Sequence, residues 1–134
     1  MRYMLDTDIC IYAIKRRPPE VLAQLRAHAA EGIGISSISV AELYFGAEKS
    51  GSEKNIRALK HFLEPLEIAE FDQNAAMAYG RIRTALERSG TPIGPLDTQI
   101  AAHASSLEVT LVTNNTREFA RVNGLKLSNW ADLP

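Results

Sequence analysis

Four oxygen-bearing side chains, spread over the length of the chain, are the residues of this sequence best suited to chemistry. They are not accompanied by a cluster of histidine or cysteine residues. Carboxylate and amide oxygens are the ligands that Mg²⁺ and Mn²⁺ prefer, whereas Zn²⁺ favours nitrogen and sulfur. Acids gathered at one point would repel one another, and a divalent cation there can activate water against a phosphodiester. The four residues are Asp6, Glu42, Asp97 and Asn115.

Asp6 and Asp97 each have a structural interpretation as well as a chemical one. Asp6, or Thr7 beside it, can cap the helical pattern that follows. Asp97 lies near a helix start, where the helix dipole and the free N–H groups favour a carboxylate. However, Asp97 also projects onto the apolar stripe that continues through Ile100 and Ala104, where an unpaired charge would be costly. This position makes Asp97 the most informative acid of the sequence.

Glu42, Asn115 and Glu118 are also open to two interpretations. Glu42 follows Ser39 at the spacing of a capping box, which requires no function. Asn115 is typical of a turn, and Glu118, one helical turn later, is typical of a solvated surface. Yet Asn115 follows a strand, as Asp6 does, and ligands of open α/β sheets bind beyond the carboxyl ends of the strands. We therefore expect Asp6 and Asn115 at the same edge of the sheet.

The elements that must position these residues alternate between strand and helix. Short apolar or β-branched runs predict strands at 3–5, 32–36, 66–69, 110–113 and 125–127. Helical periodicity predicts helices at 7–15, 18–29, 53–63, 96–107 and 117–122. Two more are predicted from their caps: one runs from a cap at Ser37 or Ser39 to about residue 48, and the other from a cap at Asp72 to residue 88. This alternation predicts an α/β fold with a mainly parallel central sheet of four to five strands, flanked by about seven helices.

Composition narrows the class of protein further. A chain of 134 residues without a linker or internal repeat is expected to form a single domain over residues 1–134. The net charge of −1 argues against coating nucleic acid by bulk charge. The one cysteine, Cys10, lies between isoleucines and is expected to be a buried structural thiol. Because the sequence has no apolar run that could span a bilayer and no secretory leader, we expect a cytoplasmic protein without a membrane partner.

Four blocks of the sequence, taken together and in this order, resemble those of PIN-domain ribonucleases. The blocks are Met4–Cys10, Ser39–Leu43, Pro92–Asp97 and Val112–Phe119. Within that family the chain is most similar to VapC toxins of type II toxin–antitoxin pairs. The resemblance implies the PIN fold and an endoribonuclease activity that depends on Mg²⁺ or Mn²⁺.

The resemblance also implies roles for individual residues. Asp6, Glu42 and Asp97 match the acidic positions of the family, with Asp6 and Asp97 as metal ligands. The fourth position is often Asp in the wider family and is Asn115 here. Since an amide brings no charge, Glu118 is a candidate additional acid.

The partners that the resemblance implies are RNA, a second copy of the chain and a VapB-type antitoxin. The antitoxin commonly places a basic side chain at the acidic site. The block that ends at Asp97 resembles members of the family that cut initiator tRNA in the anticodon loop, so tRNA is the expected substrate. Basic residues near the blocks are candidate RNA contacts, foremost Lys49, Arg81 and Arg117.

Two other functions compete with this hypothesis. A phosphatase of the haloacid dehalogenase type also begins with a strand that ends in Asp-x-Asp, which Asp6 and Asp8 match. That enzyme would use Asp8 as a general acid, whereas we assign Asp8 to the start of the helix. A non-enzymatic binding module that retains the fold with a weak metal site is the second alternative, and Asn115 favours it.

Overall fold

A five-stranded parallel sheet forms the centre of the molecule. The computed structural model describes residues 1–132. The strands are β1 (Tyr3–Leu5), β2 (Ile33–Ser36), β3 (Glu67–Ala69), β4 (Thr110–Val112) and β5 (Leu127–Ser128). Their order is β3-β2-β1-β4-β5, and every pair is parallel. The predicted α/β fold is therefore confirmed, with the first strand of the chain at the middle of the sheet.

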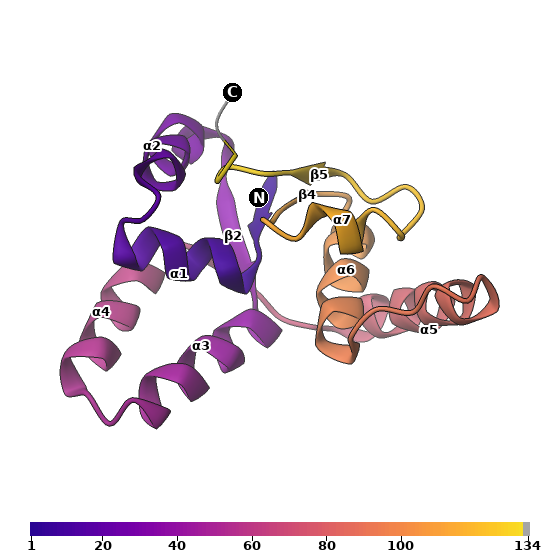
Figure 1. Ribbon diagram of the computed structural model, residues 1–134, viewed down its shortest axis with the longest axis horizontal. Coiled ribbons are helices and arrows are strands. Elements are labelled where there is room, and N and C mark those ends of the chain that lie inside the picture. Colours follow the sequence, from indigo (N-terminus) through magenta and orange to yellow (C-terminus); the bar gives the residue numbers. More distant parts are fainter. Residues whose placement is uncertain (133–134) are drawn as a thin grey trace.

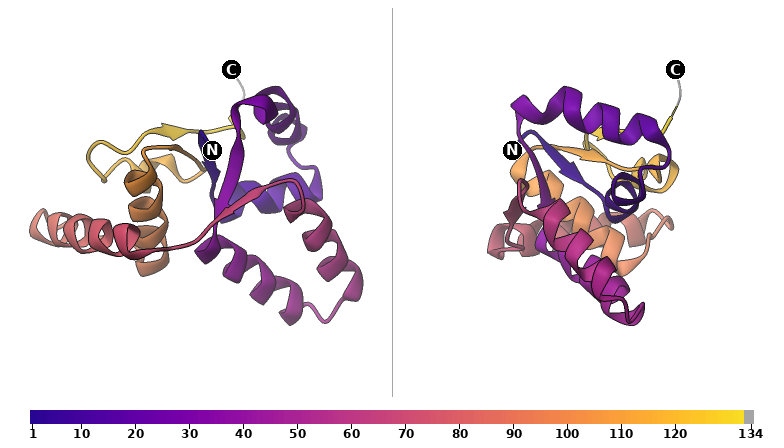
Figure 2. Two further views of the ribbon diagram at one scale, coloured as in Figure 1. Left: turned by 180° about the vertical axis from the view of Figure 1, so that it is seen from behind. Right: turned by 90° about the vertical axis from the view of Figure 1, so that its left-hand side faces the viewer.

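Helices cover the sheet in two groups, which lie on either side of the strands in Figures 1 and 2. The first group packs together as α1 (Thr7–Lys15), α2 (Pro19–His28), α3 (Ser37–Lys49) and α4 (Glu53–Leu63). The second consists mainly of α5 (Gln73–Arg88) and α6 (Pro95–Leu107), which pack tightly against each other. A short helix, α7 (Thr116–Phe119), follows β4.

Two hydrophobic cores result, because successive side chains of a strand point to opposite faces of the sheet. In β1, Leu5 packs with the α1–α4 group and Met4 packs with α5 and α6. In β4, Val112 packs in the same core as Leu5, and Leu111 packs in the same core as Met4. Cys10 is fully buried in the first core, as the sequence predicts. Both faces of the central strands are thus dry, and polar groups at this depth need partners.

Several element boundaries differ from the sequence-based expectation. The last strand comprises Leu127–Ser128, not 125–127, because its register with β4 places Leu127 beside Leu111. The helix expected at 117–122 is only α7, and a short 3₁₀ helix, η1 (Ala29–Glu31), follows α2. Among the helices of residues 1–132, none combines the length and the apolar character of a membrane span.

The start of α3 is set by Ser36, and the predicted cap at Ser37 or Ser39 is wrong. Ser36 is the last residue of β2, and its Oγ accepts a hydrogen bond from the N–H of Ile38 at 3.1 Å. Ser36 Oγ also lies 2.7 Å from Nδ1 of the buried His103 of α6. Ser39 is fully buried within the helix, and its Oγ has no hydrogen-bond partner among the described residues.

These two serines should respond in opposite ways to loss of the hydroxyl. Ser36→Ala removes the helix cap and the partner of His103, so it should lower the free energy of unfolding by about 1–3 kcal/mol. Ser39→Ala removes an unsatisfied buried hydroxyl and should change stability by less than about 0.5 kcal/mol, or raise it. Urea unfolding of both variants checks this, and an equal loss in the two would contradict the assigned cap.

Candidate metal centre

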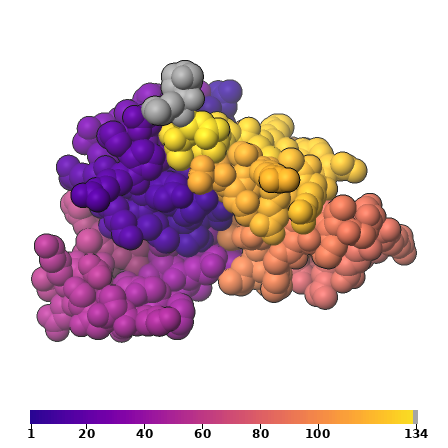
Figure 3. Space-filling model, in the orientation of Figure 1, coloured from indigo at the N-terminus to yellow at the C-terminus, as the bar shows by residue number. Residues whose placement is uncertain are grey.

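The central strand carries Asp6 to the carboxyl edge of the sheet. Asp6 follows β1 directly, and its N–H donates to the carbonyl of Val112 at 2.8 Å, which continues the pairing of β1 with β4. Thr113 follows β4 at the same edge, and Ser36 ends β2 there. Figure 3 shows that the indigo start of the chain, the magenta α3 region and the orange C-terminal third meet near the middle of this face. Residues distant in the sequence thus converge beside Asp6.

Asp6 is both a helix cap and a buried carboxylate of the site, so its two interpretations hold together. Its Oδ1 accepts from the N–H of Thr7 at 2.8 Å, and its Oδ2 accepts from Thr113 Oγ1 at 2.7 Å. The side chain is 6% exposed. Burial, and then the charges of Asp8 and Asp97, raise the pKa of Asp6 to about 7, although both hydrogen bonds oppose that rise. The Asp6 carboxylate is therefore held in one orientation, and no lysine or arginine of residues 1–132 forms an ion pair with it.

Asp97 lies in the first turn of α6 and is half-buried, so it too combines both interpretations. Pro95 begins the helix one residue earlier than predicted. Burial, and then the charges of Glu118, Glu42 and Asp8 in that order, raise the pKa of Asp97 to about 6. Asp97 therefore experiences acids from three other elements of the chain.

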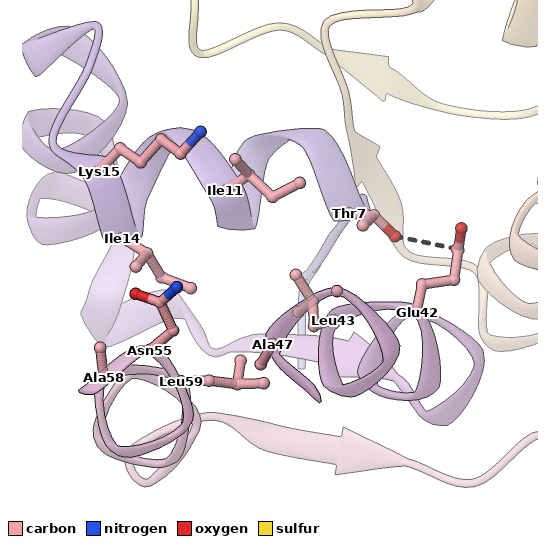
Figure 4. Close-up of a pocket in the computed structure, with 11 residues that line it drawn as sticks. Thr7, Ile11, Ile14, Lys15, Glu42, Leu43, Ala47, Asn55, Ala58 and Leu59 are labelled. Atoms are coloured by element: carbon pink, nitrogen blue, oxygen red, sulfur yellow. Dashed lines mark hydrogen bonds between the residues drawn. The ribbon is translucent and has the colours of Figure 1, made fainter. Parts of the chain in front are cut away.

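Glu42 faces the site from α3, and the predicted capping box with Ser39 is wrong. Because the helix begins at Ser37, Glu42 lies beyond its first turn. Glu42 Oε1 instead accepts from Thr7 Oγ1 at 3.1 Å (Figure 4). Since the N–H of Thr7 also donates to Asp6, this one residue orients two of the predicted acids.

Asn115 and Glu118 form a pair at the rim of the site. Asn115 Nδ2 donates to Glu118 Oε2 at 2.6 Å, and the N–H of Gly94 donates to Glu118 Oε1 at 3.3 Å. The N–H of Asn115 donates to Thr113 Oγ1 at 3.0 Å. Among the neighbouring charges, that of Glu118 raises the pKa of Asp97 the most. The structure therefore brings Glu118 into the acidic cluster and gives Asn115 an orienting contact with it.

Sequence reasoning missed two contributors, Thr113 and the charge of Asp8. Thr113 is fully buried, and a hydroxyl directly after a strand that neighbours β1 is the signal that could have identified it. Asp8 does lie at the helix start, as predicted, but its Oδ2 also accepts from the N–H of Asn114 at 3.1 Å. Its charge is the largest one that raises the pKa of Asp6. Asp8 therefore belongs to the helix start and to the electrostatics of the site.

The donor set fits a hard divalent cation. Five carboxylates lie at this edge, and none of them forms an ion pair with a lysine or arginine within residues 1–132. No three His, Cys, Asp or Glu side chains of that range converge as a ready-made metal cage. Mg²⁺ commonly binds through one or two carboxylates and retains several waters, so it does not need such a cage. The five are Asp6, Asp8, Glu42, Asp97 and Glu118.

The three predicted RNA contacts lie on three different helices. Arg117 is exposed in α7, beside Glu118. Lys49 is exposed at the end of α3, two helical turns beyond Glu42, with its Nζ 5.8 Å from the centre of the Phe45 ring. Arg81, on α5, lines a small hollow that faces the turn after α7. Their contact with RNA remains a prediction.

An apolar groove leads away from the acids on the side of α1. It has a volume of about 310 Å³ and lies between α1, α3 and α4 (Figure 4). Ile11, Ile14, Leu43 and Leu59 line its length, and Glu42 lies at one end. Ile11 is 37% exposed, so this apolar wall is open to solvent. The groove thus combines apolar walls with an acidic end.

Comparison with known proteins identifies relatives over nearly the whole chain. The family model described as "PIN domain" matches residues 3–125. The ribonuclease VapC2 of Haemophilus influenzae is 47% identical over 131 residues, which cover 97% of this chain and 98% of that protein. The tRNA(fMet)-specific endonuclease VapC of Salmonella typhimurium is 41% identical over 131 residues, with the same coverage.

Solved structures agree with these relatives. The VapBC2 complex of Rickettsia felis, bound to a DNA fragment from its promoter, contains a chain 45% identical to this one, with a TM-score of 0.92. The match covers 97% of this chain and 99% of that one. A chain of the DNA-bound VapBC complex of Salmonella typhimurium is 41% identical, also with a TM-score of 0.92, and the match covers 97% and 98% of the two chains.

The acidic cluster makes stability depend on pH in a defined direction. The raised pKa values of Asp6 and Asp97 mean that the folded state retains protons that the unfolded state releases. The free energy of unfolding of the metal-free protein should therefore decrease as the pH rises from about 4 to about 7. Asp97→Asn should raise it by about 1 kcal/mol at pH 8, after allowance for solvent screening.

Denaturant unfolding between pH 4 and pH 8, in the presence of EDTA, measures this effect. Replacement of the exposed Asp132 by Asn is the matched control and should leave the pH profile unchanged. A stability that increases steadily from pH 4 to pH 8 in the unmodified protein would contradict the description of the cluster.

Proposed function

Because this chain belongs to the PIN domain family, we propose that it is a VapC-type endoribonuclease that hydrolyses RNA phosphodiester bonds with Mg²⁺ or Mn²⁺ as cofactor. It acts as the toxin of a VapBC-type toxin–antitoxin pair. One observation of the site carries the proposal: five acids from four separate segments meet at the carboxyl edge of the sheet without a basic partner among the described residues. A divalent cation is the natural counter-charge for such a cluster.

Asp6 and Asp97 would hold the metal, with Glu42 and Glu118 beside them. The cation, when bound, supplies Lewis-acid polarisation of the scissile phosphate and lowers the pKa of a bound water. The chain supplies orientation, because Thr113 and the N–H of Thr7 hold the Asp6 carboxylate from two sides. Thr7 also holds Glu42, so the two acids keep a constant separation.

Glu118 takes the place of the missing fourth aspartate in this proposal. Asn115 donates to Glu118 without neutralising it, so the negative charge of Glu118 still acts on Asp97 and is available to a cation. Glu118 thus supplies, at the rim of the site, the negative charge that Asn115 lacks. It also favours an active enzyme over the binding module that the amide suggested.

The proposed substrate is tRNA, including the anticodon loop of initiator tRNA. The support comes from the relatives of Salmonella typhimurium and Shigella flexneri, which are named tRNA(fMet)-specific endonucleases and are 41% and 42% identical to this chain. Such a substrate places the protein in the cytoplasm. Arg117, exposed beside Glu118, is the best-placed basic residue to hold the RNA backbone near the acids.

The apolar groove is the proposed docking site for part of the VapB antitoxin. An amphipathic helix can lay its apolar face along Ile11, Ile14 and Leu59, which is a common mode of peptide recognition. The groove ends at Glu42, so a basic side chain at that end of the antitoxin segment would reach the acids. We also propose a homodimer, for which the exposed Phe45 and Met77 offer apolar surface.

RNA cleavage should depend on a divalent cation and on Asp97. Purified protein without antitoxin should cleave total tRNA in Mg²⁺ or Mn²⁺ and should be inactive in EDTA. Asp97→Asn should reduce the rate by at least about 100-fold, because it removes a proposed metal ligand. Asp8→Asn should stay within about tenfold of the unmodified protein, because Asp8 contacts the backbone of Asn114.

The same assay separates the proposal from its two alternatives. A phosphatase would lose all turnover in Asp8→Asn and would form a phosphoenzyme on Asp6. A binding module would cleave neither tRNA nor mRNA in any metal. Cleavage by the purified protein that is equally present in EDTA, or in Asp97→Asn, would reject the mechanism.

The groove can be tested without disturbing the acids. Ile11→Glu places a charge in the apolar groove, so it should weaken binding of the cognate antitoxin by about tenfold or more and leave tRNA cleavage intact. Leu107→Glu changes a similarly exposed apolar residue at the end of α6 and is the matched control. Calorimetric titration with the antitoxin measures both, and equal affinities for the two variants would remove the groove from the proposal.

A further inference from the structure

His103 is the buried titratable residue that the proposed mechanism leaves unused. It lies on α6 with 1% of its surface exposed, and its Nδ1 is 2.7 Å from Ser36 Oγ. Ser36 caps α3, the helix that carries Glu42, whereas α6 carries Asp97. A single buried hydrogen bond therefore joins the two helices that bring these acids to the site from opposite sides.

The surroundings of His103 favour the uncharged form of its ring. Nδ1 of His103 faces Ser36 Oγ, and that oxygen already accepts from the N–H of Ile38, so its own hydrogen is free to donate to Nδ1. Burial lowers the pKa of His103, which favours the uncharged ring and so favours Nδ1 as an acceptor. A neutral imidazole can donate on one side and accept on the other, which an aliphatic side chain of this size cannot.

The surroundings connect a third segment to the same point. The Phe71 ring packs edge-on against His103 with 5.4 Å between ring centres. The N–H of Phe71 donates to Ser37 Oγ at 3.0 Å. The segment between β3 and α5 is thus held to the start of α3 and to α6 together.

The sequence of α6 explains why a directional contact is needed there. Its buried face carries three small apolar residues, Ala101, Ala102 and Ala104, beside Thr98, Ile100 and His103. The alanines offer no polar group, so the hydrogen bond of His103 with Ser36 supplies a directional contact between α6 and the start of α3. His103 lies six residues from Asp97, about 9 Å along the helix at 1.5 Å per residue, so a shift at His103 is transmitted to Asp97.

We propose that His103 is a positioning residue, which fixes α6 against the start of α3 and so sets the separation of Asp97 and Glu42 across the metal site. This inference rests on the proposed function of that site. Displacements of about 1 Å can reduce the rate of a reaction by 100-fold when they misplace reacting groups. Loss of His103 should therefore affect metal binding and turnover more than it affects the free energy of unfolding.

The test compares three variants with the unmodified protein. His103→Leu removes the hydrogen bond with Ser36 at similar volume. His103→Asn retains a polar group at the place of Nδ1 and is the conservative rescue. Val122→Ala truncates a buried residue of the same core, away from Ser36, and controls for lost stability. The measurements are kcat and KM on tRNA, the Kd for Mn²⁺ alone, and the thermal unfolding midpoint.

We expect His103→Leu to lower kcat by about tenfold or more, with KM within about twofold, and to weaken Mn²⁺ binding by about tenfold. His103→Asn should recover most of both losses, and Val122→Ala should lower the unfolding midpoint without either. If His103→Leu does not fold, Ser36→Ala removes the same hydrogen bond from the other side and should weaken Mn²⁺ binding likewise.

Two results would overturn the inference: equal behaviour of the Leu and Asn variants, or a loss of kcat and Mn²⁺ affinity in Val122→Ala that matches its loss of stability. The outcome for the proposed function is separate. If the unmodified protein cleaves no RNA, that function fails, while the Mn²⁺ affinities of the variants still decide the role of His103.

Discussion

Mutual repulsion among buried carboxylates at one edge of the sheet is the constraint on which this structure depends. Asp6 has a fixed position because it follows the middle strand of five. Asp97 and Glu118 approach from one side, and Glu42 approaches from the other. Burial and like charge raise the pKa of Asp6 to about 7, so the metal-free cluster opposes folding at neutral pH. The remainder of the fold must hold these acids together.

Uncharged side chains hold these acids in position. Thr7 bonds both Asp6 and Glu42, Thr113 bonds Asp6, and Asn115 bonds Glu118. Such donors orient a carboxylate without neutralising it, whereas a lysine or arginine would occupy the position that a cation needs. Active sites commonly sacrifice stability in this way, because charge kept unpaired is available for binding and catalysis. His103 extends the same principle to whole helices, since it fixes α6 through a neutral contact.

Much of this arrangement could be predicted from the sequence, since it follows from local pattern. Strands that alternate with helices gave the parallel sheet, and the end of a parallel strand located Asp6 and Asn115 at one edge. The cap of α3 was misjudged because Ser36, Ser37 and Ser39 are alike locally, and the contact with His103 that distinguishes Ser36 spans 67 residues. Thr113 was missed for a similar reason, because its partner Asp6 is 107 residues away. Long-range side-chain contacts leave no periodic trace in a sequence.

The central claim is that acids from separate segments form one site for a divalent cation, centred on Asp6 and Asp97. The most direct measurement is anomalous X-ray scattering from crystals of the protein soaked in Mn²⁺. We expect a Mn²⁺ peak between the carboxylates of Asp6 and Asp97, at the carboxyl edge of β1. Crystals that diffract well, take up Mn²⁺ only elsewhere and leave these two acids without metal would contradict it.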